Sequence, residues 1–255
     1  MIENSLYVWL NKNCLKSQDN MKFLRSKRFW MALIPTLIFN FRNLPFRQAI
    51  KLPILVYKIR NLSQLGKVII ESGHIYIGMI QLGFPRAATY PNNGITWRNE
   101  GTVIFKGKCY IGNDCYVIVG KQGILTFGDD FKVNAGMKLI CQCSITFGNH
   151  TRFGWGVICM DTNFHPLYDI EKKKFKRAFS PIVIGEYNWF ATQCYIMHGV
   201  HTPERCIFGA RSIVTRGGQF ESYCVHGGSP MHVLSRNVMR DYDNDLITDY
   251  TLPEK

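Results

Sequence analysis

The sequence has few acidic residues, and its first quarter has almost none. Asp and Glu number 18 against 31 Lys and Arg, which gives a formal net charge of +13. In residues 1–60 only Glu3 and Asp19 are acidic, against 11 Lys and Arg, so about +9 of the excess lies there. Such a charge suits an anionic partner, which is a phosphorylated substrate, a nucleic acid or an anionic membrane surface; the alternative is a solvated surface without a partner.

The sequence also lacks a Cys-x-x-Cys pair and a membrane-length apolar run. Its 9 cysteines are odd in number and irregularly spaced, which indicates buried thiols in a reducing compartment rather than a disulfide framework. Residues 29–41 are the most apolar, but about 13 residues that include Pro35 are too few to span a bilayer, which needs roughly 20. Basic residues follow, without a small-x-small cleavage site. We therefore expect an interfacial segment or a helix docked on the rest of the chain.

What the sequence does contain is an apolar residue at every sixth position. Neither the strand period of 2 nor the helix period of 3.6 produces such a repeat, whereas a hexapeptide period is the signature of a parallel β-helix. Glycine often follows the apolar residue, where a corner needs a small side chain. The repeat positions are Phe127, Val133, Leu139, then Phe147, Phe153, Cys159, and finally Ile184, Phe190, Ile196, Phe208 and Val214, with a miss at Thr202.

The period divides the chain into three parts. Residues 1–65 form a basic and apolar segment, in which prolines limit any helix to short pieces. Residues 66–234 form the β-helix, with its first coil expected over 68–78 and a first excursion over 84–100. Residues 235–255 lose the period and are expected to cap the β-helix or to leave it.

A second excursion, residues 160–180, interrupts the repeat where it is most regular. Long loops in a regular fold are usually functional or disordered. This one begins with Asp161-Thr-Asn-Phe-His165-Pro166. A histidine held by a following proline at the start of such a loop is suited to acid–base chemistry.

Four motifs resemble those of the hexapeptide-repeat acyltransferases, in particular the galactoside and maltose O-acetyltransferases and the polysaccharide-biosynthesis branch. The resemblance covers residues 101–235. The motifs are His165-Pro166, Asn188-Trp-Phe-Ala191, Phe208-Gly-Ala-Arg-Ser-Ile-Val-Thr-Arg216 and Gly227-Gly-Ser-Pro230. The resemblance implies an all-β, left-handed parallel β-helix that forms a homotrimer and binds acetyl-CoA between subunits, without a required metal.

The resemblance also implies roles for particular residues. His165 would be the catalytic base, with Asn134 contacting the acceptor. Asp161 would orient the imidazole or bind a sugar hydroxyl, and Trp155 would stack on the sugar. The residues expected to bind CoA are Trp189, Ala191, Ala210, Arg211, Thr215, Arg216 and Arg236, although Pro203, Arg205 and His232 depart from the family pattern.

We therefore expect a cytoplasmic acetyl-CoA-dependent O-acetyltransferase for a sugar hydroxyl of a capsular polysaccharide, exopolysaccharide or lipopolysaccharide precursor. Residues 22–60 would hold it at the inner membrane face, where lipid-linked glycans are presented. No nucleic-acid-binding module is present. Two alternatives stay open: an inactive sugar-binding scaffold, and a γ-class carbonic anhydrase whose zinc ligands would be His165, His198 and His201.

Overall fold

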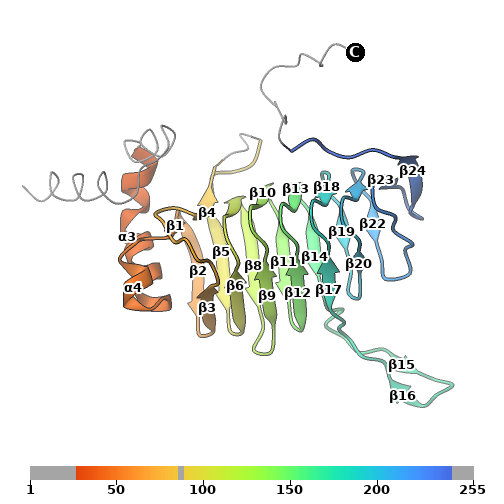
Figure 1. Ribbon diagram of the computed structural model, residues 1–255. Helices are drawn as coiled ribbons and strands as arrows, with labels where there is room; N and C mark the ends of the chain where they lie inside the picture. The colour runs from red at the N-terminus through yellow and green to blue at the C-terminus, as the bar shows by residue number, and fades with distance from the viewer. Residues whose placement is uncertain (1–26, 86–88, 243–255) are drawn as a thin grey trace, which may run out of the picture.

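The computed structural model describes residues 27–85 and 89–242, which form a prism of three parallel β-sheets preceded by two helices (Figure 1). Sheet A contains β1 (Ile54–Val56), β4 (Ile80–Phe84), β7 (Cys109–Asn113), β10 (Phe131–Ala135), β13 (Arg152–Trp155), β18 (Trp189–Phe190), β21 (Ile207–Phe208), β23 (Cys224–Gly227) and β24 (His232–Arg236). Sheet B contains β2 (Ile59–Gln64), β5 (Ile95–Asn99), β8 (Cys115–Val119), β11 (Lys138–Cys141), β14 (Ile158–Met160), β19 (Tyr195–Ile196) and β22 (Ile213–Val214). Sheet C contains β3 (Lys67–Ile70), β6 (Thr102–Phe105), β9 (Ile124–Phe127), β12 (Ser144–Phe147), β17 (Ile182–Ile184) and β20 (His201–Thr202).

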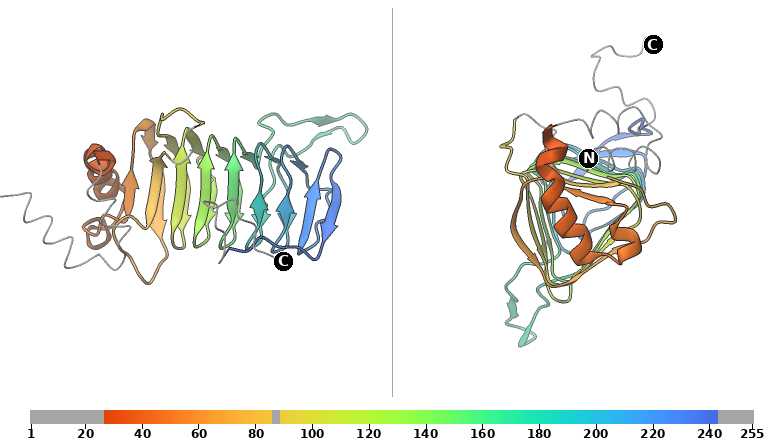
Figure 2. Two further views of the ribbon diagram at one scale, coloured as in Figure 1. Left: turned by 90° about the horizontal axis from the view of Figure 1, so that it is seen from above. Right: turned by 90° about the vertical axis from the view of Figure 1, so that its left-hand side faces the viewer.

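Successive strands visit the sheets in the order A, B, C, so each circuit is one coil of a β-helix. Neighbouring coils pair in parallel, for example Val133 with Phe153 and Phe153 with Phe190. Seen from the N-terminal end in the right-hand view of Figure 2, the chain turns counterclockwise as it recedes, so the coil is left-handed. The predicted fold class, a left-handed parallel β-helix, is confirmed.

The residues of the six-residue period form the core. All the apolar residues named above are buried. Thr202, the miss in the repeat, is also buried (7% exposed), and its hydroxyl is satisfied because it accepts a hydrogen bond from Asn188 Nδ2 (2.9 Å). Aromatic rings stack from coil to coil: Phe190 lies 5.0 Å from Phe153 and 4.4 Å from Phe208, both nearly parallel. Offset stacking of this kind adds to the free energy of apolar burial.

A column of residues with positive φ turns the chain at the corner between sheets C and A. The column contains Asp130, His150, Tyr187, Arg205 and Tyr223, with φ from 53° to 57°. Because these residues occupy the same place in successive coils, their side chains meet. The His150 ring stacks on the Tyr187 ring at 4.5 Å, and the Arg205 guanidinium lies 4.3 Å from the same Tyr187 ring. Contacts between side chains thus offset part of the cost of left-handed backbone at non-glycine residues.

The N-terminal end of the β-helix is covered by α3 (Lys27–Asn43) and α4 (Phe46–Ala49). The buried Asn40 side chain bonds both the N–H (3.2 Å) and the C=O (2.6 Å) of Ile54, and the Thr36 hydroxyl accepts the Val56 N–H (2.9 Å). These bonds satisfy the open edge of β1. A helix docked on the rest of the chain is one of the two predictions for this segment. The prediction that prolines limit any helix here to short pieces is wrong, because α3 runs for 17 residues with Pro35 inside it. No helix in the described ranges is long and apolar enough to cross a membrane.

The β-helix begins earlier than the sequence period indicates. Its first coil is β1, β2 and β3, from Ile54 to Ile70, whereas the predicted boundary between the N-terminal segment and the β-helix is at residue 66. The early coils carry no regular repeat because loops lengthen them: Ile54 pairs with Ile80 after 26 residues, and Ile80 with Cys109 after 29. At the other end β24 pairs with β23 in the antiparallel direction and closes sheet A. The tail predicted over 235–255 is described only as far as Tyr242.

Candidate active site

Residues 161–181 form an arm that leaves the β-helix between β14 and β17. The arm carries a small antiparallel pair, β15 (Tyr168–Asp169) and β16 (Lys174–Phe175), and projects from the prism (Figure 1). It departs at the corner between sheets B and C. The second excursion predicted from the interrupted period is therefore this arm.

The base of the arm is fixed by a buried carboxylate. Asp161 is 0% exposed, and its two oxygens accept the backbone N–H groups of Gln142 and Cys143, each at 2.7 Å. The Ser180 N–H bonds the Asp161 carbonyl (3.0 Å), which ties the two ends of the arm together. Charge-assisted bonds of this type are strong. Asp161 thus holds the arm in place: its carboxylate bonds these two backbone amides rather than the His165 imidazole, and the sugar contact stays a prediction.

His165 lies in a bend of the arm that precedes β15, and it is exposed. It lines a cavity of about 700 Å³ between the arm and the coils of β19 and β22. From the coils the cavity receives Met197, His198, Thr215 and Arg216, and from the arm Asn163, Leu167, Lys174, Phe175, Lys176, Arg177 and Ser180. Of the predicted residues, His165, Thr215 and Arg216 are therefore brought together. We call this space the arm cavity.

The arm cavity is cationic. Lys174, Lys176, Arg177 and Arg216 line it, and of these only Lys176 has an acidic partner among the described residues, Asp169 at 3.4 Å. Lys and Arg side chains grouped in this way suit the phosphates of a nucleotide-bearing ligand such as CoA. Only Arg216 of the four was predicted for this role. The others belong to the charged run of the arm, whose place in space the sequence does not define.

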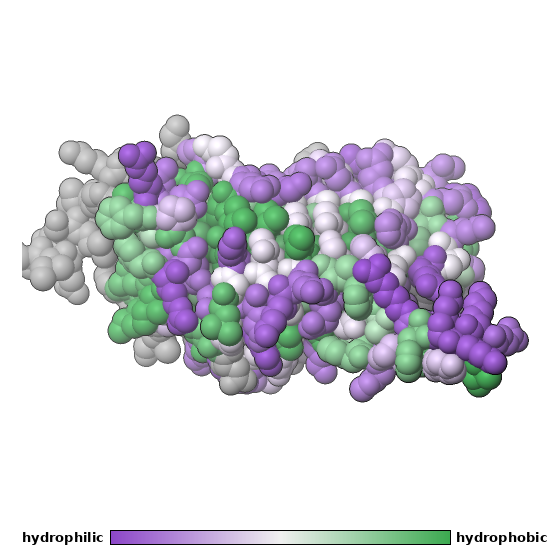
Figure 3. Space-filling model, turned by 90° about the horizontal axis from the view of Figure 1, so that it is seen from below, coloured by the Kyte–Doolittle hydropathy of each residue, from purple (hydrophilic) through white to green (hydrophobic). Residues whose placement is uncertain are grey.

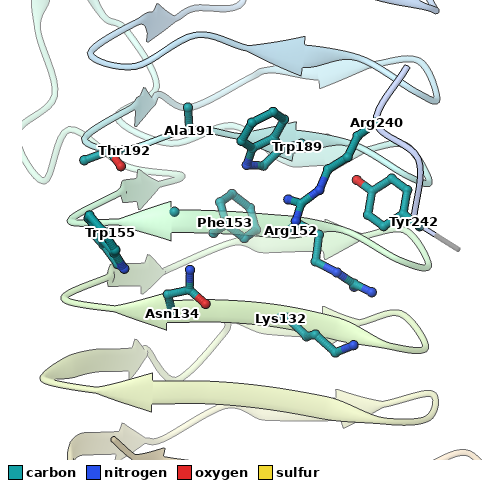
Figure 4. A pocket seen from close by; sticks show the side chains of 11 residues that line it. Lys132, Asn134, Arg152, Phe153, Trp155, Trp189, Ala191, Thr192, Arg240 and Tyr242 are labelled. Atoms are coloured by element: carbon teal, nitrogen blue, oxygen red, sulfur yellow. The ribbon is translucent and has the colours of Figure 1, made fainter. Parts of the chain in front are cut away.

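A second depression lies on the outer face of sheet A (Figure 4). This sheet A groove, of about 620 Å³, is formed by β10, β13 and β18 and overhung by the C-terminal segment. The predicted residues Asn134, Trp155, Trp189 and Ala191 all line it. Its further lining is Lys132, Arg152, Phe153, Gly154, Thr192, Arg240 and Tyr242.

The cations of the sheet A groove were not predicted. Lys132 pairs with Arg152 and Arg152 with Trp189 in the strand register, so they form one column. Arg152 and Lys132 (3.0 Å) both bond Asp130. Burial alone would raise the pKa of Asp130, but the hydrogen bonds and charges of these two cations hold its pKa below the ordinary value. Arg240 lies over the Trp189 ring at 4.7 Å.

The remaining predicted residues lie apart from both spaces. Ala210 and Arg211 turn the chain between sheets A and B, where Arg211 Nε bonds Gln193 (2.9 Å). Arg236, near the C-terminal end, pairs with Glu221 through two bonds of 3.0 and 3.1 Å. Within the described ranges no group of three or more His, Cys, Asp or Glu side chains could hold a metal ion, so His165, His198 and His201 do not form a zinc site in one chain.

Fold and site together define a hexapeptide-repeat β-helix protein with a histidine-bearing arm. No family model matches the sequence. Over 136 residues the chain is 29% identical to the polysialic acid O-acetyltransferase of Escherichia coli O1:K1 / APEC, a match of 52% of this chain and 44% of the relative. Over 108 residues it is 28% identical to the galactoside O-acetyltransferase of Lactococcus lactis subsp. lactis (strain IL1403), covering 42% of this chain and 51% of the relative.

The matches therefore span about half the length of these curated relatives. Among solved structures, that of the polySia-specific acetyltransferase NeuO aligns with a TM-score of 0.47 and 20% identity, over 74% of this chain and 91% of that one. Both curated relatives are O-acetyltransferases, so the resemblance inferred from the four motifs is confirmed.

Proposed function

We propose that the protein is an acetyl-CoA-dependent O-acetyltransferase that modifies a sugar hydroxyl of a capsular polysaccharide, exopolysaccharide or lipopolysaccharide precursor. The observation that carries the proposal is the position of His165. It is exposed on a firmly anchored arm, facing a cavity that also contains Thr215 and several cations. The curated relatives act on polysialic acid and on galactosides by name, which supports a sugar acceptor.

In the proposed reaction the His165 imidazole accepts the proton of the acceptor hydroxyl as its oxygen attacks the thioester carbonyl. The new C–O bond forms and the C–S bond breaks, and the imidazolium returns the proton to the leaving thiolate. Histidine suits both steps because its ordinary pKa lies near neutral pH. The cations of the arm cavity would hold the CoA phosphates.

The sheet A groove is the proposed acceptor site. Trp155 is 39% exposed there and can stack on a sugar ring, while Asn134 offers an amide for its hydroxyls. Lys132 and Arg152 make the groove suitable for an acidic glycan. In one chain the groove lies on the face of sheet A, whereas the arm leaves the prism at the corner between sheets B and C, so the two spaces are separate. A homotrimer, in which the arm of one copy faces the groove of the next, would unite them.

We place the enzyme in the cytoplasm at the inner face of the membrane, with residues 22–60 in contact with it. Lipid-linked glycan precursors would be within reach in that position. The charge of this segment supports the placement.

Thiol release from acetyl-CoA by the purified full chain, with polysialic acid, galactosides and other glycans as acceptors, tests the function. We expect acceptor-dependent release that falls about 10²–10⁴-fold in His165→Ala, with CoA affinity retained. His201→Ala is the matched control, because His201 is exposed on β20 and lines neither space. Near-normal turnover in His165→Ala would refute the mechanism. CoA binding without turnover would mean that the acceptor is missing from the panel, whereas absence of CoA binding would favour the scaffold.

A further inference from the structure

The face of α3 that points away from the coils is apolar. Its buried stripe, which includes Thr36, Phe39 and Asn40, packs on the first coils, so the opposite stripe faces outward. Ile34 is 70% exposed, and the exposed residues recur at intervals of three, one and three positions, which places them on one side of a helix. We define the end face as the exposed apolar residues of α3 and its continuation: Ile34, Leu37, Ile38, Phe41, Phe46 and Ile50.

The end face stands in a region without any acidic residue. From residue 20 to residue 70 the sequence has 10 Lys and Arg and no Asp or Glu. Arg42, Arg47 and Lys51 are exposed beside Phe41, Phe46 and Ile50. None of these three cations takes part in an ion pair among the residues that the structure describes. Arg42 donates a hydrogen bond to the Gln64 carbonyl (3.4 Å), but no carboxylate pairs with any of the three charges, so they suit an anionic surface.

The shape of this end suits a flat partner. In the right-hand view of Figure 2 α3 lies across the end of the prism rather than along its axis. Figure 3 shows hydrophobic side chains gathered at the same end. A stripe of aliphatic and aromatic residues parallel to the end, flanked by cations and free of acids, is the pattern of helices that lie in a bilayer interface.

We propose that the end face docks on an anionic membrane, with Ile34, Ile38 and Phe41 entering the acyl boundary and Arg42, Arg47 and Lys51 at the lipid phosphates. The inference deepens the membrane contact proposed above by naming the residues and the lipid charge. The binding itself does not depend on the acetyltransferase chemistry, so either proposal can fail without the other.

The test is co-sedimentation of the full chain with phosphatidylcholine vesicles, with and without phosphatidylglycerol. We expect binding that requires the anionic lipid and weakens between about 0.1 M and 0.5 M salt. The triple variant Arg42→Gln, Arg47→Gln, Lys51→Gln is expected to lose about 100-fold in partitioning, since each cation contributes roughly fivefold near an anionic surface. Its charge-matched control is Lys106→Gln, Lys121→Gln, Lys138→Gln, whose cations are exposed on the coils.

The double variant Ile34→Gln, Ile38→Gln tests the apolar stripe and is expected to lose more than about 10-fold in partitioning. Leu234→Gln, exposed at the far end of the prism, is expected to bind like the wild type. Equal binding to neutral and anionic vesicles, or equal losses in the controls, would overturn the proposal. Light scattering without vesicles gives a further check. If the Ile34 and Ile38 substitutions dissociated an oligomer, the end face would join copies of the chain, and the proposal would also be overturned. Thiol release with a soluble acceptor should stay unchanged in every one of these variants.

Discussion

Replacement of Asp161 by Asn separates a structural role of this residue from a role in sugar binding. The carboxylate is 0% exposed and accepts two backbone N–H groups at 2.7 Å. Asparagine has one acceptor oxygen, so its NH₂ group would face the second amide. Losing one charge-assisted bond and leaving a buried N–H unpaired costs about 2–3 kcal/mol.

That loss should appear as opening of the arm, because Asp161 anchors its base. The arm contains Lys172, Lys173, Lys174, Lys176 and Arg177, all exposed, so trypsin reports on the opening. A change of about 2 kcal/mol raises the open population roughly 30-fold, and the cleavage rate follows when opening is fast relative to cleavage. We therefore expect arm cleavage to be about 30-fold faster in Asp161→Asn, with a reduced kcat.

An exposed carboxylate elsewhere supplies the control: Glu204→Gln should leave arm cleavage unchanged. If Asp161 instead bound the sugar, Asp161→Asn would raise the KM for the acceptor and leave the cleavage rate as in the wild type. That result would refute the structural interpretation of this carboxylate.

Three further predictions concern the core, an ion pair and the groove. Phe190→Ala should lower the free energy of unfolding by about 3–5 kcal/mol in urea titrations, and Phe190→Leu by less than about 1.5, because the ring is fully buried between two stacked neighbours. Asp130→Asn should destabilise the protein at pH 7. Because folding lowers the pKa of this carboxyl, its contribution to the free energy of unfolding is complete above its unfolded pKa and disappears as pH falls through the folded pKa. The free energies of unfolding of wild type and variant should therefore converge in acid. Convergence at high pH would contradict this assignment. Trp155→Ala should raise the KM for the glycan by about 5–100-fold while the KM for acetyl-CoA is kept, and an effect on acetyl-CoA alone would exclude the groove as the acceptor site.

The parts of the fold that the sequence predicts are those in which neighbouring residues carry the signal. Each coil buries a residue every six positions, so Phe127, Phe153, Phe190 and Phe208 could be recognised as core. The arm is predictable for the same reason, since it interrupts that period. His165 is found through its proline and its place in the arm.

The groove could not be predicted because it depends on the contacts between coils. Arg152 lies beside Lys132 after 20 residues, but Trp189 lies beside Arg152 only after 37, since the arm intervenes. Lateral neighbours thus follow from coil length, which the period alone does not give. The sequence likewise shows that Asp161 is a carboxylate in a loop, but not that two backbone amides point at it.

The stacking of coils also sets a distance. Parallel strands of neighbouring coils are about 4.8 Å apart. The arm departs from the fifth coil, that of β13 and β14, while α3 covers the first. The β-helix therefore acts as a rigid spacer of about 19 Å between the basic end and the base of the arm. Insertion or deletion of one whole coil would raise or lower His165 by a single fixed step without altering its surroundings. If the basic end docks on a membrane as proposed, the length of the repeat region would set the height at which His165 meets an acceptor.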